Sequence, residues 1–238
     1  MKSPPTRTKT GADPGESISE PGPSATPGPV AGWDDRPVAP GTPSDDDAVV
    51  DEDLVTRARR MYLSRFAWID GHADPWAPLR DPQTLTLIID ALAHLVVSLN
   101  PTVVLSIEAR GFLYGPAVAS RAGVGFTAVR KAHGPFPGSL IEAESPADYR
   151  GNRHRLRLRR DDLRPGDRVV LVDDWIETGS QAITAMRMAE QAGGRWAGCA
   201  VIVDQSTAPT RTAVGPVRSF VAASALPATG VPRNSADD

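Results

Sequence analysis

The chain has 238 residues and a formal net charge of −3, which leaves room for one large domain or two small ones. Because the charge is close to zero, the whole molecule is not an electrostatic nucleic-acid binder, and the single cysteine, Cys199, can neither form a disulfide within the chain nor hold a zinc ion alone. The N-terminus lacks the apolar core of a secretory signal, and the longest apolar run, Leu85 to Leu99, is interrupted by Asp90 and His94. We therefore expect a cytoplasmic protein with no membrane span.

The first fifty residues differ in composition from the rest. Residues 1–50 are rich in Pro, Gly, Ser, Thr and Asp and nearly free of Leu and Ile, so they bury too little apolar surface to offset the entropy of ordering. We expect a disordered tail there, a folded domain over 51–228 and a second disordered end over 229–238. The acids Asp51 to Asp53 can cap a first helix that runs to about Phe66.

A regular alternation of helices and strands follows. Asp81-Pro82 begins a second helix, whose apolar residues repeat at three-four spacing until Asn100-Pro101 ends it. The expected strands are 102–107, 126–130, 168–172 and 197–203, and the expected later helices are 112–122 and 181–192. Continuous apolar strands between helices predict an α/β fold with a doubly wound, mostly parallel sheet flanked by helices. Ligands in such sheets bind at the carboxyl ends of the strands.

Two segments interrupt this alternation. Residues 131–152 contain several glycines and prolines and fit no helix or strand, so we expect a flexible lid loop. Residues 153–160 read Arg-His-Arg-Leu-Arg-Leu-Arg-Arg, an alternation typical of a strand with one apolar face. A solvated edge strand with a protective row of charges accounts for this basic run better than nucleic-acid binding does.

The strongest functional pattern follows the third expected strand. There a buried run, Val169 to Val172, leads into Asp173-Asp174, and the sequence Trp-Ile-Glu-Thr-Gly-Ser-Gln then opens a helix. A helix N-terminus offers unpaired N–H groups to an anion, and a glycine allows the backbone to approach a phosphate closely. Paired carboxylates accept hydrogen bonds from neighbouring hydroxyls or hold a divalent cation. Together these groups suit a sugar diol beside a phosphate monoester.

This string, VVLVDDWIETGSQA, resembles the phosphoribosyl-pyrophosphate (PRPP) motif of type I phosphoribosyltransferases. The segment Ile107 to Pro116, IEARGFLYGP, is similar to the first strand–loop–helix of the adenine phosphoribosyltransferase-like branch. Val129-Arg130-Lys131 followed by Pro137-Gly138 is similar to the strand end and flexible loop of that branch. The resemblance covers about residues 54–205 and implies the fold of that family, with a small N-terminal hood over the sheet.

The resemblance also implies a role for each matching residue. Asp173 and Asp174 would bind the ribose hydroxyls, with Mg²⁺ as the cofactor, and Arg110 and Lys131 would hold the pyrophosphate. Asp148-Tyr149 would take the place of a catalytic Glu-Tyr pair of the family. The 5-phosphate would be bound by Glu177, Thr178, Gly179, Ser180 and Gln181.

The chain departs from the adenine branch at two places. Glu177 stands where that branch usually has alanine; it either faces the base as a general acid or base, or points to solvent. The Phe-Arg-Asp segment of the hood has lost its arginine, and Trp68, Trp76 or Trp175 are candidates to contact the base instead.

We therefore expect an enzyme that transfers ribose 5-phosphate from PRPP to a purine or purine-like base, adenine first, with release of pyrophosphate and a nucleoside monophosphate. One alternative is a regulator of the same fold that senses PRPP or a nucleotide without turnover. Another is an unrelated doubly wound domain whose acids bind a metal for phosphoryl chemistry. The resemblance further suggests a homodimer, and we expect no nucleic-acid or membrane partner.

Overall fold

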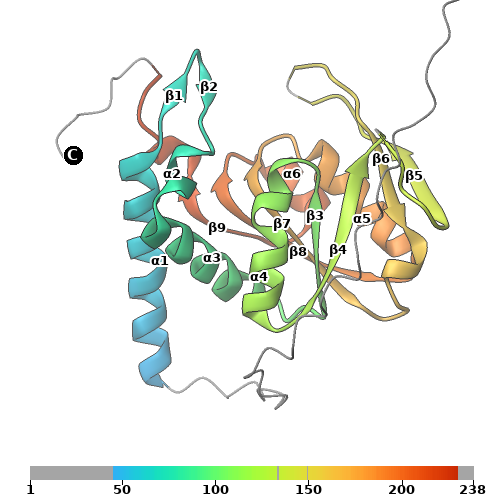
Figure 1. Ribbon diagram of the computed structural model, residues 1–238, viewed down its shortest axis with the longest axis horizontal. Helices are drawn as coiled ribbons and strands as arrows, with labels where there is room; N and C mark the ends of the chain where they lie inside the picture. The colour runs from blue at the N-terminus through green and yellow to red at the C-terminus, as the bar shows by residue number, and fades with distance from the viewer. Residues whose placement is uncertain (1–44, 133, 149, 230–238) are drawn as a thin grey trace, which may run out of the picture. The chain divides into compact units, whose positions relative to one another are not determined.

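A seven-stranded sheet lies at the centre of the computed structural model, which describes residues 45–132, 134–148 and 150–229 (Figure 1). The strand order is β5-β6-β4-β3-β7-β8-β9. Strands β4, β3, β7, β8 and β9 are parallel, whereas β6 is antiparallel to both β4 and β5. The prediction of a mostly parallel sheet is thus confirmed. The strands are β3 (Val103–Ile107), β4 (Gly125–Lys131), β5 (Leu140–Glu144), β6 (Arg155–Arg159), β7 (Arg168–Ile176), β8 (Arg195–Asp204) and β9 (Val217–Ala222).

Helices cover both faces of this sheet. α1, α3 and α4 pack on one face, and α5 and α6 pack on the other. Short 3-10 segments lie at Arg110–Leu113 (η1), Arg160–Asp162 (η2) and Ala223–Ala225 (η3). The helices are α1 (Asp45–Arg65), α2 (Ala77–Arg80), α3 (Pro82–Val97), α4 (Gly115–Ala122), α5 (Ser180–Gln191) and α6 (Ala208–Val214). None of the helices among the described residues is long and apolar enough to cross a membrane.

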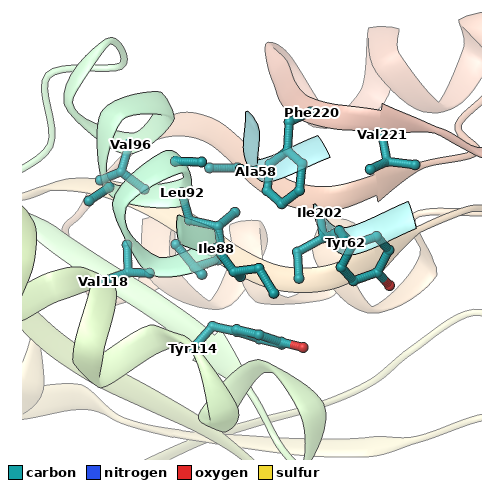
Figure 2. Close-up of a cluster of buried hydrophobic side chains, with 14 of the residues drawn as sticks. Ala58, Tyr62, Ile88, Leu92, Val96, Tyr114, Val118, Ile202, Phe220 and Val221 are labelled. Carbon is teal, nitrogen blue, oxygen red and sulfur yellow. The ribbon is translucent and has the colours of Figure 1, made fainter. Parts of the chain in front are cut away.

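The central strands are buried on both faces, which explains their unbroken apolar sequences. In β7, Val170 and Val172 point into a core cluster with α1, α3 and α4, whereas Val169 and Leu171 point into a second cluster with α5. The four-residue spacing on α3 brings Ile88, Leu92 and Val96 onto the first cluster (Figure 2). Side chains of successive strand residues point to opposite faces, so each face requires its own set of apolar residues.

Several boundaries differ from the sequence prediction. α1 begins at Asp45 rather than after Asp51–Asp53, because the sequence has no proline or glycine between Pro43 and Gly71 to end a helix. The expected helix 112–122 is divided into η1 and α4. Residues 1–44 and 230–238 lie outside the described part of the chain, so the two expected disordered ends stay predictions.

The segment 131–152 holds a strand, contrary to the expectation of a loop without secondary structure. β5 pairs with β6 because Leu140 to Glu144 alternates apolar and polar residues and buries Ile141. The edge strand is therefore β5, and the expectation that the basic run forms the edge is wrong. The basic run is paired with acids: Arg155 bonds Glu142, Arg153 bonds Glu144 (3.6 Å) and Arg159 bonds Asp162 (3.3 Å). This pairing agrees with a structural role for the basic run.

A small hairpin forms the N-terminal hood. β1 (Trp68–Ile69) and β2 (His72–Ala73) are joined by Asp70 and Gly71, both with positive φ, as expected for a two-residue hairpin turn with an Asp-Gly sequence. The hairpin and the loop between β5 and β6 both lie at the top of Figure 1. Arg150 Nη2 of that loop lies 2.8 Å from His72 Nδ1 of the hairpin, so the hood and the loop are in contact.

Candidate functional site

The two acids of the central motif lie inside β7, near its carboxyl end. β7 continues past them to Ile176, with Asp173 opposite Val201 of β8. Asp174 is buried, and Asp173 Oδ1 accepts a hydrogen bond from the N–H group of Asp174 (2.9 Å). Burial first, and the neighbouring Asp174 carboxylate second, raise the pKa of Asp173 above its usual range. Two carboxylates are therefore fixed side by side at the centre of the sheet.

Arg110 lies against this acidic pair. The loop after β3 turns into η1, and Arg110 Nη1 donates to Asp174 Oδ2 at 2.7 Å. The side chain of Asp174 is 10% exposed and that of Arg110 is 51% exposed, so the guanidinium also faces outward. Gly111 makes the close approach possible, because a Cβ atom there would lie 3.2 Å from the Val172 carbonyl oxygen and 3.4 Å from Asp173 Oδ1. The peptide bond between Glu108 and Ala109 is cis.

A third strand end, that of β4, carries Lys131. Glu108 accepts hydrogen bonds from the backbone N–H of Lys131 (3.0 Å) and from Arg130 Nε (3.3 Å). Arg157 Nη2 donates to the Lys131 carbonyl oxygen (3.2 Å). Glu108 was not among the predicted site residues, although an acid directly after a buried strand was the available signal. Glu108 joins the ends of β3 and β4 and fixes the backbone from which Lys131 extends.

The phosphate-type loop joins β7 to α5. Gly179 has a φ of 70° and stands at the N-cap of α5, where it has no side chain to cap the helix; Thr178 Oγ1 accepts the N–H of Ser180 at 3.4 Å. A Cβ atom on Gly179 would lie 2.7 Å from Thr210 Cγ2 of α6. The α6 helix also contacts the loop through Thr210 Oγ1, which donates to the Thr178 carbonyl oxygen (3.4 Å). The loop is thus held closely by α6, with the N-terminus of a twelve-residue helix behind it.

Glu177 begins this loop and is half-buried. Burial first, and the negative charge of Asp148 second, raise the pKa of Glu177 above its usual range. Asp148 Oδ1 accepts the N–H groups of Arg150 and Asn152 (2.9 Å each), and Asp148 Oδ2 lies 3.3 Å from His154 Nε2. Although burial alone would raise it, these hydrogen bonds hold the pKa of Asp148 below its usual range. Asp148 therefore shapes the loop between β5 and β6; Tyr149 lies outside the described residues.

Comparison with known proteins places this arrangement in a family. Residues 76–221 match the family described as the phosphoribosyl transferase domain. The chain belongs to the type I phosphoribosyltransferases. An adenine phosphoribosyltransferase from Streptomyces clavuligerus is 34% identical over 154 residues, 62% of this chain and 85% of that protein.

Solved structures agree with the family assignment. An adenine phosphoribosyltransferase from Rhodothermus marinus has a TM-score of 0.61 and 28% identity, covering 70% of this chain and 99% of its own. The enzyme from Saccharomyces cerevisiae, solved with adenine and an imino-altritol bisphosphate, has a TM-score of 0.61 and 25% identity over the same shares. The predicted family and its adenine-like branch are thus confirmed. An unrelated doubly wound domain is excluded.

The phosphoribosyltransferase site has an aromatic side next to the hood. The rings of Trp68 and Trp175 meet edge to face with centroids 6.3 Å apart. Trp68 Nε1 donates to the Pro227 carbonyl oxygen (2.8 Å), and Trp175 Nε1 donates to Gln205 Oε1 (2.9 Å). Both indole N–H groups are therefore fixed, which leaves ring faces and edges for contacts. Trp76, by contrast, is 62% exposed at the start of α2.

The sequence-predicted residues thus fall into three groups. The structure brings Arg110 to Asp174, Glu177 to the vicinity of Asp148, and Trp68 to Trp175. Lys131 stands at the end of β4, two strands from β7. Thr178, Gly179, Ser180 and Gln181 form the loop and first turn of α5. The roles assigned to these residues stay predictions.

Proposed function

We propose that this phosphoribosyltransferase transfers ribose 5-phosphate from PRPP to adenine, releasing pyrophosphate and adenosine monophosphate. The observation that carries the proposal is the Asp173-Asp174 pair on β7, with Arg110 bonded to Asp174 and the N-terminus of α5 following β7 after a short loop. These groups suit the three parts of PRPP, in which the ribose diol lies between the 1-diphosphate and the 5-phosphate. The similar proteins named above are enzymes that bear the name adenine phosphoribosyltransferase, which favours catalysis over a sensing role.

In this proposal the 5-phosphate binds over the loop from Glu177 to Gln181, where backbone N–H groups and the helix dipole favour an anion. Asp173 and Asp174 accept hydrogen bonds from the two ribose hydroxyls. Arg110 and Lys131 bind the pyrophosphate. The negative charge on the leaving pyrophosphate grows as the C1–O bond breaks, so these cations stabilise the transition state more than the ground state.

The acidic pair also fits the expected magnesium ion. No group of three or more metal-binding side chains occurs among the described residues, so these residues alone do not provide a closed metal site. Mg²⁺ typically uses one or two carboxylates and takes its remaining ligands from substrate phosphates and water, a pattern that Asp173 and Asp174 match. When bound, Mg²⁺ would neutralise charge on the pyrophosphate; the residues themselves orient the ribose.

Glu177 is our candidate for proton transfer with the base. Adenine must lose the proton from the ring nitrogen that bonds to the ribose carbon, and a carboxylate with a raised pKa is a better proton acceptor than an ordinary one. The partial burial of Glu177 and its closeness to Asp148 favour an inward position over a solvent-facing one. The catalytic role expected for Asp148 is indirect in this proposal, because hydrogen bonds occupy both of its oxygens.

Trp68 and Trp175 are our candidates for contact with the base. Trp68 lies in the hood, where the resemblance expected an arginine that this chain lacks, and Trp175 of β7 packs against it. The indole N–H groups of both are already bonded. A purine ring can stack on such a face, and stacking accepts any planar base. Trp76 is exposed to solvent and is the weaker candidate for contact with the base.

Pyrophosphate release tests the proposal directly. The full chain is incubated with PRPP and Mg²⁺ and, in turn, with adenine, hypoxanthine, guanine and other purines. We expect release with adenine, and its loss in an Asp173→Asn/Asp174→Asn variant whose melting curve stays cooperative. Release with another base alone would keep the phosphoribosyltransferase and refute adenine. Tight PRPP binding without release from any base would support the sensor.

Two further expectations join the proposal. We propose that the protein acts as a homodimer, which sedimentation at several protein concentrations tests; a monomer throughout would refute it. We also propose that it acts in the cytoplasm, where PRPP and free bases are expected, and localisation of a tagged chain tests this.

A further inference from the structure

One arginine of the basic run differs from its neighbours in what it binds. The side chain of Arg155 pairs with an acid, Glu142, on the adjacent strand. Arg157, two residues further along β6, donates to backbone carbonyl groups: its Nη2 lies 3.2 Å from the Lys131 oxygen and 3.0 Å from the Gly134 oxygen. Because this nitrogen carries two hydrogens, it can serve both carbonyls at once. Arg157 thus joins the last residue of β4 to the segment that follows it.

A second arginine binds the same segment. Arg130 is the Cα partner of Arg157 in the pairing of β4 with β6. Its Nη1 donates to the Pro135 carbonyl oxygen (3.0 Å), and its Nε donates to Glu108 (3.3 Å). The centroid of the Phe136 ring lies 5.6 Å from Arg130 Cζ and 6.0 Å from Arg157 Cζ, within the range of cation–π contacts. Arg130, Arg157 and Phe136 together form an arginine clamp on the chain after β4.

The arginine clamp acts on the backbone of Lys131. Side chains hold this residue at both ends, because Glu108 accepts its N–H (3.0 Å) and Arg157 binds its carbonyl oxygen (3.2 Å). Such bonds matter at this place, since strand ends open more easily than strand centres and the chain after Lys131 is rich in Gly and Pro. Successive strand residues point to opposite faces. The clamp therefore lies on one face of the sheet, with Arg130, and the Lys131 side chain extends from the other.

We propose that Arg157 is a positioning residue for pyrophosphate, and that it acts by fixing the Cα atom from which Lys131 reaches the diphosphate of PRPP. A lysine has a long, flexible side chain, so a fixed backbone lowers the entropy that it loses when its ammonium binds a ligand. This inference rests on the proposed function. It gives one residue of the basic run a role in substrate binding that is exerted through Lys131 and not by contact with PRPP.

The shape of the guanidinium is essential to this role. Arginine presents planar donors in a fixed fork and stacks on aromatic rings, whereas lysine is a compact charge on a flexible stem. Arg157→Lys therefore keeps the positive charge and loses the clamp, which separates positioning from simple attraction of PRPP by charge. Arg155 is the matched control, because it lies on the same strand and its side chain, 66% exposed, is paired with Glu142.

The first experiment measures the Kd for PRPP with Mg²⁺ by calorimetry, without base, together with the steady-state constants of full-length variants. Arg157→Lys and Arg157→Gln should each raise the Kd for PRPP about tenfold and leave the KM for the base unchanged. Arg155→Lys and Arg155→Gln should leave both constants unchanged.

A double-mutant cycle tests whether Arg157 acts through Lys131. Lys131→Ala removes the ammonium that the arginine clamp positions. In that background, Arg157→Gln should change the Kd for PRPP by no more than about twofold, because the two residues act as one unit. Additive effects of the two changes would overturn the inference, since Arg157 would then act on PRPP by another route.

Three further outcomes would also overturn the inference. Full PRPP affinity in Arg157→Lys would show that charge alone suffices. An equal loss of affinity in the Arg155 variants would indicate a general effect of charge on β6. If the Arg157 variants do not melt cooperatively, Phe136→Leu decides, because it loosens the clamp and keeps every charge: its Kd for PRPP should rise, and an unchanged Kd refutes positioning.

The same measurements separate this inference from the proposed function. A parent chain that neither binds nor turns over PRPP would refute both. A parent chain that does turn over PRPP, with constants that Arg157→Gln leaves unchanged, would refute the positioning role alone.

Discussion

Gly179→Ala tests whether close packing against α6 fixes the phosphate-type loop. Gly179 has a φ of 70°, a conformation that costs a residue with a side chain about 1–2 kcal/mol. The new methyl group would also lie 2.7 Å from Thr210 Cγ2, and such overpacking costs about 1–3 kcal/mol. Because the two effects add, we expect the variant to lose about 2–5 kcal/mol of unfolding free energy.

Gly123→Ala separates the two contributions. Gly123 has a φ of 69°, almost that of Gly179, but no atom lies within 4 Å of its Cβ position. This control should therefore show only the backbone cost of about 1–2 kcal/mol. Adding Thr210→Ser to Gly179→Ala should recover most of the stability that Gly179→Ala loses beyond Gly123→Ala. The second change deletes Cγ2 and keeps the hydroxyl that bonds the Thr178 carbonyl oxygen.

Urea denaturation of the four variants and the parent gives these free energies, and PRPP kinetics report on the loop. Gly179→Ala should raise the KM for PRPP, since the loop must move away from α6, whereas Gly123→Ala should leave it unchanged. Equal losses of stability in Gly179→Ala and Gly123→Ala would refute a role for close packing against α6. So would a lack of recovery on adding Thr210→Ser, after correction for the effect of Thr210→Ser alone.

Three more perturbations test other parts of the site. Asp148→Asn should move the acid limb of the pH profile of kcat/KM for the base to lower pH. The variant removes the negative charge that is, next to burial, the cause of the raised pKa of Glu177. A pH–rate profile with an unmoved acid limb argues against Glu177 as the titrating base. Trp68→Ala should raise the KM for the base about tenfold at constant KM for PRPP, since one stacked ring contributes about 1–3 kcal/mol; parallel changes in both constants would contradict a base-specific contact. Cys199 is buried, and burial raises the pKa of its thiol, so a chromogenic thiol reagent should react only in denaturant; rapid reaction of the native chain would show that β8 opens.

The central strand and its loop could be predicted from the sequence because local chemistry decides them. Four consecutive apolar residues before two acids require a strand buried on both faces, and Gly179 after Thr178 allows only a tight turn into a helix. The resemblance to the family singled out Arg110 and Lys131, and a general property of parallel sheets, whose carboxyl ends lie at one edge, accounts for their positions at the ends of β3 and β4.

Other features depend on contacts between distant residues. β5 is a strand because Ile141 packs in the second core cluster and Glu142 pairs with Arg155. The glycines and prolines around β5 predict neither of these two contacts. The contact between Gly179 and Thr210 joins segments 31 residues apart, and no local pattern indicates it. The Asp70-Gly71 turn carries the Asp-Gly pair typical of a hairpin, a local pattern that was available although the hairpin was not among the predicted elements.

The ion pair between Arg110 and Asp174 joins an exposed cation to a buried acid. The guanidinium is 51% exposed, so water screens its charge and competes for its donors. The multiple charges of a pyrophosphate offer the guanidinium a stronger partner. Asp174 has no such freedom, since it is fixed in β7 between β3 and β8 and is largely removed from water. Arg110 is thus the mobile member of the pair and Asp174 the fixed one. This division suits a site in which the sheet sets the position of the ribose and a loop sets the position of the pyrophosphate.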